Sequence, residues 1–324
     1  MSSQISSIHS PDQRLTLEFN AAGDILRFYE RLEDGSAIDY FHRPEGNRNP
    51  LMHPWANRVE KGEFSFGGEK HVLRPLHGAE NNALHGNWTS PWVVTESGEN
   101  RVVLDIQCAA EDGISNPARR SPYEYDARQV LTLTNEGLSV EMEVTNRGVT
   151  LPFGLGLHPF LPRPQDTVVK MAVSKMENTR ADMIPDPANP VIDAPAEWTL
   201  SEGFNISNKN LSPAARGFNH ADLMDNSFPG VDPDKGATVT WPSFGAEGRE
   251  MTVTASENCT FGVIFVPGAA NDAPAGQQSF FCLELTTNGI NMHNRPAGEA
   301  GGTVLEKGQM LKASTTYSIR KLGR

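Results

Sequence analysis

The sequence has few cysteines, no long hydrophobic run and no excess of positive charge. Its three cysteines, Cys108, Cys259 and Cys282, show no metal-ligand spacing and cannot all pair, which favours buried, reduced thiols in a cytoplasmic protein. No apolar run reaches about 18 residues, the length that a membrane-spanning helix needs. Residues 1–12 are polar and lack the apolar centre of a signal peptide. We therefore expect a soluble, cytoplasmic protein that does not enter a membrane.

The charge balance is acidic, with 40 Asp and Glu against 28 Lys and Arg and a net charge of −12. This sign disfavours nucleic acid and anionic membrane surfaces as partners, because both are polyanions. The net charge does not exclude a local basic pocket, since Arg43, Arg48 and Arg58 lie close together in the sequence. Scattered surface arginines are the simpler interpretation of these three residues.

Motifs for nucleotide binding and serine hydrolysis are absent. The sequence contains no Gly-x-Gly-x-x-Gly or other phosphate-cradling loop and no Gly-x-Ser-x-Gly elbow. His71, His77 and His85 match no common metal-ligand spacing, and no His-x-His pair occurs. The sequence therefore predicts neither a metal nor a cofactor.

Alternation of apolar and polar residues with a period of two dominates the sequence and indicates β-strands. Segments of this kind are 15–19, 102–108, 129–134, 138–145, 237–241, 250–255, 261–266, 280–285 and 312–320. No stretch of 12 residues has a convincing helical period. We expect an all-β fold, a single large antiparallel β-sandwich whose two sheets each bury one side. Residues 1–11 are expected to be a flexible N-terminus, and residues 12–322 one domain.

Turns and loops separate these strands. Asn135-Glu136-Gly137 joins two of them and predicts a hairpin with Gly137 at a positive φ. Residues 110–121, 182–212 and 218–235 are rich in polar residues, proline or glycine and are expected to be surface loops. The last two are long connections, which often carry binding groups.

Two titratable residues stand out because strand-like apolar segments surround them. Burial of His158, in residues 151–160, would lower its pKa, and a neighbouring carboxylate would raise it again. Glu284 shares one strand face with Cys282, opposite Leu283. If that face lines a cavity, Glu284 is a carboxylate with a raised pKa, suited to a general base. The same pattern also fits residues without a catalytic role: His158 as a hydrogen-bonded core histidine and Glu284 as a solvated glutamate.

His85 and Asp225 are further candidates. His85 precedes Gly86, a residue that allows a ligand to approach the backbone closely. Asp225 lies with Asp222 in a polar segment expected to be a loop. Aspartates in such segments cap turns or bind hydroxyl groups, and the sequence leaves both roles open.

The order of these motifs resembles that of the aldose 1-epimerase (mutarotase) family, over residues 12–320. The matching motifs are Asn57-Arg58-Val59, Gly62-Glu63-Phe64, Gly67-Gly68-Glu69, Asn82-Ala83-Leu84-His85-Gly86, Pro152-Phe153-Gly154, His158-Pro159-Phe160, Asp225-Asn226-Ser227-Phe228 and Cys282-Leu283-Glu284. The resemblance implies a galactose mutarotase-like β-sandwich. It also implies an enzyme that interconverts the α and β anomers of a free aldose without a metal or cofactor.

The resemblance assigns roles to five residues. Glu284 would be the general base that takes the proton of the C1 hydroxyl, and His158 the general acid that protonates the ring oxygen as the C1–O5 bond opens. His85 would hydrogen-bond that oxygen or its neighbour. Arg58 and Asp225 would bind sugar hydroxyls. Rotation about C1–C2 and reclosure of the aldehyde then give the other anomer.

The sequence also departs from the family's pattern near the expected substrate, so it does not decide which sugar is bound. His85 is followed by Gly-Asn, Glu284 is followed by Leu-Thr-Thr, and Asn291-Met292-His293-Asn294 is expected at the pocket edge. Alternative functions are an epimerase for a phosphorylated or other anionic sugar, a non-catalytic carbohydrate-binding protein on the same fold, and a glycoside hydrolase that uses Glu284 and Asp225. The expected partner is a small sugar, and the protein is expected to be a monomer or homodimer.

Overall fold

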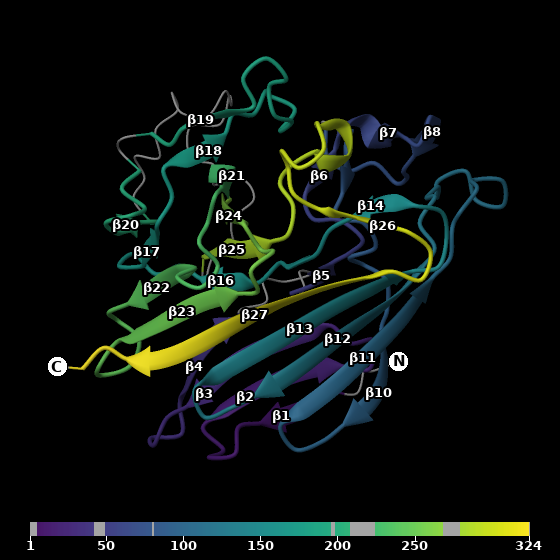
Figure 1. Ribbon diagram of the computed structural model, residues 1–324. Coiled ribbons are helices and arrows are strands. Elements are labelled where there is room, and N and C mark those ends of the chain that lie inside the picture. Colours follow the sequence, from purple (N-terminus) through teal and green to yellow (C-terminus); the bar gives the residue numbers. More distant parts are fainter. Residues whose placement is uncertain are drawn as a thin grey trace.

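The computed structural model describes residues 5–41, 49–79, 81–195, 198–207, 224–267 and 279–323, and their regular structure is almost entirely β-strand (Figure 1). The largest element is a nine-stranded antiparallel sheet, whose long strands cross the front of Figure 1. Its order is β10 (Val93–Ser97), β11 (Arg101–Cys108), β12 (Tyr125–Leu133), β13 (Gly137–Asn146), β27 (Met310–Lys321), β23 (Arg249–Ala255), β22 (Ala237–Trp241), β17 (Val168–Met171) and β20 (Phe204–Asn205).

Two smaller sheets pack against the large one. The six-stranded sheet has the order β21 (Met224–Pro229), β24 (Phe261–Val266), β25 (Phe280–Thr286), β15 (Gly156–Leu157) and β5 (Leu51–Met52), and β16 (Phe160–Pro162) also pairs with β25. The four-stranded sheet consists of β1 (Ile5–His9), β2 (Leu15–Asn20), β3 (Ile25–Arg31) and β4 (Ala37–Phe41).

Short pairings and turns complete the described elements. The two-stranded pairs are β6 (Arg58–Val59) with β9 (Ala83–Leu84), β7 (Glu63–Phe66) with β8 (Glu69–Val72), β14 (Leu151–Phe153) with β26 (Thr303–Leu305), and β18 (Lys175–Glu177) with β19 (Val191–Asp193). The 3₁₀ turns are η1 (Glu60–Gly62) and η3 (Met292–Asn294). In the part of the chain that the structure describes, we find no helix with the length and hydrophobicity of a membrane span.

The period-two alternation of the sequence decides which side chains form the core. On β13, Val140 and Met142 are buried and Glu141 between them is exposed. One hydrophobic cluster joins such residues with side chains of the smaller sheets, including Phe28 of β3 and Leu283 of β25. The predicted all-β antiparallel sandwich is therefore confirmed.

The hairpin predicted at Asn135-Glu136-Gly137 joins β12 to β13, but the reason for its glycine differs from the expected one. Gly137 does not have a positive φ. A Cβ atom at this position would lie 1.9 Å from the carbonyl oxygen of Tyr317 on the neighbouring strand β27. Glycine is needed here because two backbones approach closely.

Two segments differ from the prediction. Ile5–His9, expected in a flexible N-terminus, forms β1 and pairs with β2. Met224–Pro229, expected in the surface loop 218–235, forms β21. The sequence pattern did not predict β21 because residues on both of its faces are buried. Its polar residues therefore do not mark a solvent-facing side.

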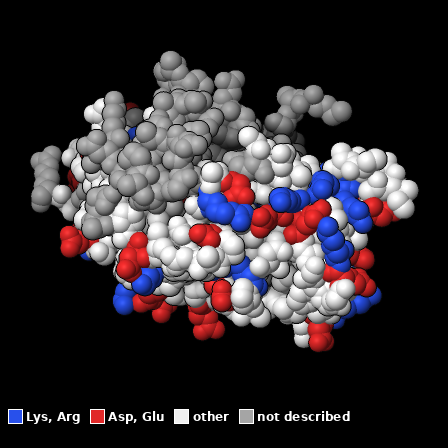
Figure 2. Space-filling view, turned by 90° about the horizontal axis from the view of Figure 1, so that it is seen from above, with Lys and Arg blue, Asp and Glu red and all other residues white. Residues whose placement is uncertain are grey.

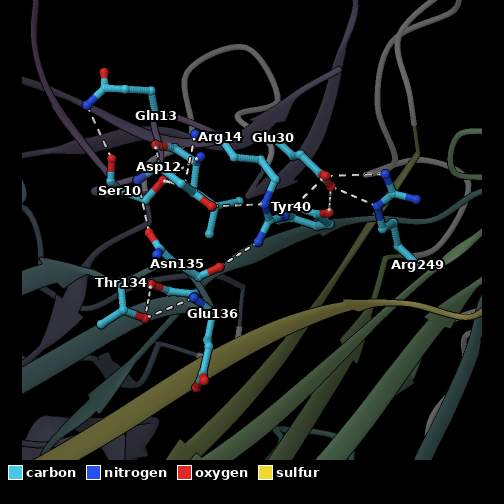
Figure 3. A network of polar contacts seen from close by, with 12 residues as sticks. Ser10, Asp12, Gln13, Arg14, Glu30, Tyr40, Thr134, Asn135, Glu136 and Arg249 are labelled. Atoms are coloured by element: carbon cyan, nitrogen blue, oxygen red, sulfur yellow. Dashed lines mark hydrogen bonds and ion pairs between the residues drawn. The ribbon is translucent and has the colours of Figure 1, made fainter. Parts of the chain in front are cut away.

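A buried ionic network ties the four-stranded sheet to the nine-stranded sheet (Figure 3). Glu30 of β3 accepts hydrogen bonds from Arg249 Nε of β23 at 2.7 Å and from the hydroxyl of Tyr40 at 2.5 Å. Arg14 lies 3.1 Å from the same carboxylate and donates to the carbonyl oxygen of Asn135 at 2.6 Å. Burial acts to raise the pKa of Glu30, but these hydrogen bonds hold it below its ordinary value. Glu30 is therefore a buried carboxylate that links the two sheets.

Candidate active site

Strand β25 carries the candidate general base, and both of its faces are buried. Phe281 and Leu283 of one face belong to the core between the sheets. Cys282 of the opposite face packs against Phe160 of β16. Glu284 shares that second face and is only 2% exposed. The sequence left open whether Glu284 is solvated, and the structure shows a buried carboxyl group.

The imidazole of His158 contacts this carboxyl group. Its Nε2 lies 3.3 Å from Oε1 of Glu284. His158 follows β15 and precedes β16, and both of these strands pair with β25. The ring stacks on Phe160, with 5.1 Å between ring centroids, and the main-chain N–H of His158 donates to the carbonyl oxygen of Pro50 at 2.9 Å. His158 is thus fixed against Glu284 by neighbouring strands.

His85 lies beside His158, with ring centroids 5.1 Å apart. Its Nδ1 accepts a hydrogen bond from the main-chain N–H of Asn57 at 3.0 Å. A neutral imidazole with this acceptor carries its proton on Nε2, so the geometry assigns the tautomer. Burial, helped by the nearby charges of His158 and Arg58, holds the pKa of His85 well below 6.5. His85 is therefore a neutral ring that can donate from Nε2.

The turn that carries His85 depends on a close approach of two backbones. His85 and Gly86 both have a left-handed conformation, with φ of 54° and 60°. A Cβ atom at Gly86 would lie 2.2 Å from the carbonyl oxygen of His53. Glycine is therefore required beside His85, and this accounts for the His-Gly pair in the sequence.

Arg58 and Asp225 form an ion pair in the same site. Nη2 of Arg58 on β6 lies 3.0 Å from Oδ2 of Asp225, and both side chains are largely buried. Asp225 pairs in register with Phe265, which in turn pairs with Cys282. Asp225 therefore projects from the same face of the sheet as Glu284. Its expected place in a loop is wrong, because Asp225 lies within strand β21.

Burial keeps the Glu284–His158 pair close to neutrality. Desolvation raises the pKa of Glu284 well above 4.5, an effect that the charge of Asp225 strengthens and that of Arg58 opposes. Desolvation lowers the pKa of His158 to about 4. Both shifts favour the uncharged forms, in which the pair carries one titratable proton, on the carboxyl group of Glu284. A carboxylate beside an imidazolium holds the same single proton at a different atom.

The structure brings the five residues proposed from the sequence into one site. They are Arg58, His85, His158, Asp225 and Glu284. Arg43 and Arg48, considered as a basic cluster, lie outside the described residues. His71 and His77, considered as metal ligands, belong to no group of three or more potential ligands among the residues that the structure describes.

Two neighbours of the site were not found from the sequence. Asn57 was noted only as part of the Arg58 motif, and its contact with His85 depends on a main-chain group that no side-chain pattern reveals. Trp88 is partly exposed, and its ring lies 5.7 Å from that of His85. Its closeness to His85 in sequence was the available signal. An aromatic ring in this place offers a surface for the apolar face of a sugar.

A family model also identifies the chain. The model described as Aldose 1-epimerase matches residues 32–318. The protein therefore belongs to the aldose 1-epimerase family, and the resemblance inferred from the order of its motifs is confirmed.

Two Escherichia coli K12 proteins are similar in sequence. The uncharacterised protein YphB is 26% identical over 251 residues, which are 77% of this chain and 76% of YphB. The uncharacterised protein YihR is 29% identical over 176 residues. This match covers 49% of this chain and 53% of YihR, so the chain spans about half the length of YihR.

Solved structures show the same fold. The GalM/aldose epimerase homologue from C. elegans has a TM-score of 0.79 and 14% identity, covering 99% of this chain and 100% of that chain. Galactose 1-epimerase from Lactobacillus acidophilus NCFM has a TM-score of 0.73 and 15% identity, covering 100% of both chains. The fold is therefore the galactose mutarotase-like β-sandwich that the sequence predicts.

Proposed function

We propose that the protein is a mutarotase, an isomerase that interconverts the α and β anomers of a free aldose. The main support is the 3.3 Å contact between Glu284 Oε1 and His158 Nε2 in a buried pair whose pKa shifts favour a single titratable proton. Ring opening requires one proton to be removed from the sugar and one to be delivered, so such a pair can serve both directions of the reaction. Membership of the aldose 1-epimerase family supports the same reaction class.

The proposed reaction begins with the proton of the pair on His158. Glu284 takes the proton of the C1 hydroxyl as the C1–O5 bond breaks, and C1 becomes an aldehyde carbon. The electron pair of the broken bond goes to O5, which receives the proton from Nε2 of His158. Rotation about C1–C2 presents the other face of the aldehyde, and the reverse transfers close the ring. Both sugar oxygens are bonded to C1, so an acid and a base in contact with each other can reach them together.

The other three residues of the site bind the sugar in this proposal. The neutral ring of His85 donates from Nε2 to the ring oxygen or a neighbouring hydroxyl. Arg58 supplies donors and Asp225 an acceptor for hydroxyl groups. Their ion pair at 3.0 Å holds both side chains in place before a sugar binds, which lowers the entropy that binding costs.

An anionic sugar is the weaker alternative. Its phosphate or carboxylate would need a cation that is not already neutralised, and Asp225 neutralises Arg58 in the described part of the site. Figure 2 shows acidic and basic side chains interleaved over the described surface at the end of the molecule seen from above. Among the residues that the structure describes, neither observation provides a cluster of positive charge. We therefore propose a neutral aldose as the substrate.

A protein that binds sugars without catalysis is a second alternative. Such a protein would gain nothing from a buried glutamate and histidine in contact, because burying titratable groups costs free energy. A glycoside hydrolase would need a second catalytic carboxyl group, and Asp225 is held in an ion pair by Arg58. Both observations favour the mutarotase.

Anomer equilibration tests the proposal directly. We expect the purified protein to accelerate the change in optical rotation of at least one freshly dissolved neutral aldose. The same polarimetric series should include aldose 6-phosphates and uronic acids. If only the anionic sugars equilibrate faster, they and not neutral aldoses are the substrates. Binding seen by calorimetry without any acceleration would identify a carbohydrate-binding protein instead.

The pH dependence of kcat/KM should be a broad bell. As the pH falls through the lowered pKa of His158, about 4, the pair gains a second proton and the base is lost. As the pH rises through the raised pKa of Glu284, the pair loses its proton and the acid is lost. Rates in buffers of constant ionic strength measure both limbs. An acid limb near 6.5, the ordinary value of histidine, would contradict a buried neutral His158.

A further inference from the structure

Residues 287–295, which follow β25, make hydrogen bonds to the segment that carries Asn57 and Arg58. Oδ1 of Asn288 accepts the main-chain N–H of Ala56 at 3.1 Å, and its Nδ2 donates to the carbonyl oxygen of Ala56 at 3.0 Å. Asn288 is buried, and a Cβ atom at Gly154 would lie 2.0 Å from its Oδ1. One buried amide thus holds both main-chain groups of the residue before Asn57.

Asn291 bonds the same segment at Arg58 itself and at Glu60, two residues later. Its main-chain N–H donates to the carbonyl oxygen of Arg58 at 2.8 Å, and its Oδ1 accepts the main-chain N–H of Glu60 at 3.0 Å. Asn291 is buried in a left-handed conformation with φ of 57°, which asparagine adopts more readily than most residues. The sequence placed this residue at the pocket edge. In the structure it bonds the main chain that carries Arg58.

A buried ion pair anchors residues 287–295 in turn. Glu177 of β18 accepts the main-chain N–H of Ile290 at 3.0 Å and pairs with the guanidinium of Arg295. Both side chains are buried, at 0% and 7% exposure. A Cβ atom at Gly289 would lie 2.7 Å from Oε1 of Glu177, so the carboxylate fills the space that this glycine leaves. The ion pair therefore fixes the segment from which Asn288 and Asn291 bond their partners.

We propose that Asn291 is a positioning residue for the guanidinium of Arg58. The inference rests on the proposed mutarotase function, in which Arg58 binds sugar hydroxyls. The 3.0 Å contact of Arg58 with Asp225 depends on where the main chain of Arg58 lies, and Asn291 bonds the carbonyl oxygen of Arg58 and the N–H of Glu60, two residues later. Glu284 is held separately by its own strand. Loss of the side-chain amide of Asn291 should therefore weaken sugar binding and leave the rate of the proton transfers unchanged.

Asn291→Gly is the informative variant. Glycine accepts the φ of 57° and keeps the main-chain bond to Arg58, but it removes Oδ1. We expect KM to rise about tenfold and kcat to change by less than about twofold. Hydrogen exchange at the main-chain amide of Glu60 should become faster in the same variant, because that group loses its acceptor.

Two further variants serve as controls. Asn291→Asp keeps an acceptor oxygen and should return KM to within about threefold of the wild-type value. Asn81→Gly makes the same exchange at an exposed left-handed asparagine, with φ of 55°. It should leave both KM and the exchange of Glu60 unchanged.

The outcomes separate the positioning role from the proposed function. An unchanged KM in Asn291→Gly, or a fall in kcat at constant KM, would overturn the positioning role while the mutarotase function stands. A wild-type protein inactive on every sugar would remove the proposed function. Hydrogen exchange would then decide on Asn291 alone: faster exchange at Glu60 in Asn291→Gly supports its hold on the Arg58 segment, and unchanged exchange overturns it.

Discussion

Replacement of Glu284 by glutamine is expected to lower kcat/KM for anomer equilibration by about 10³-fold or more, since a positioned acid–base group contributes typically 10² to 10⁴. Glutamine keeps the shape of the side chain but can neither take the proton of the C1 hydroxyl nor share one with His158. The carboxyl group of Glu284 is 2% exposed, so water cannot easily replace it as the base. Polarimetry with the best sugar of the initial screen measures the loss.

The control for this variant is Cys282→Ala, two residues earlier on the same face of β25. It disturbs the packing around Phe160 without removing a group that the mechanism uses, so its activity should stay within about tenfold of the wild type. The thermal midpoint of Glu284→Gln should stay close to that of the wild type, because an uncharged amide of similar shape replaces a carboxyl group whose ionised form burial disfavours. Activity near the wild-type level in Glu284→Gln would remove this residue as the base.

Replacement of Arg249 by methionine is expected to lower the free energy of unfolding by about 3 kcal/mol or more, because it leaves a buried carboxylate without its main partner. Glu30 and Arg249 are 2% and 3% exposed, and Arg249 Nε lies 2.7 Å from the carboxylate (Figure 3). Tyr40 and Arg14 would still contact Glu30 and offset part of the loss. Urea unfolding at pH 7 measures the difference.

The control for this second variant is an ion pair that is more exposed to solvent. Arg27 pairs with Asp39 between the neighbouring strands β3 and β4, but these side chains are 37% and 31% exposed. Arg27→Met should therefore cost less than about 1 kcal/mol. The double variant Glu30→Met with Arg249→Met should be more stable than Arg249→Met alone, since it removes the unpaired charge. Equal stability of Arg249→Met and Arg27→Met would show that the buried network does not hold the sheets together.

The sequence predicts the fold well where one face of a strand meets solvent. β13 is an example, because Glu141 is exposed between buried Val140 and Met142 and the period of two is plain. β21 was missed because Asp225 and Asn226 are both buried, one facing the site and the other turned to the opposite side of the sheet. A polar residue on a strand buried on both faces has no pattern that separates it from a loop residue.

The site was predictable to the level of side chains but not of main-chain contacts. The order of motifs brought His158 and Glu284 together as a pair, and their pairing with neighbouring strands explains why they meet. The tautomer of His85 could not be foreseen, because the main-chain N–H of Asn57 determines it. The same holds for Asn291, whose contact with Arg58 involves backbone groups on both sides.

The burial of every residue of β25 limits how this protein can change over generations. Mutations on one face of the strand disturb Leu283 and the central core, and those on the other disturb the packing of Cys282. The strand that bears Glu284 therefore has little freedom to drift, and a descendant with a new sugar preference must acquire it elsewhere. Partly exposed positions such as Trp88 are where we expect such divergence to accumulate.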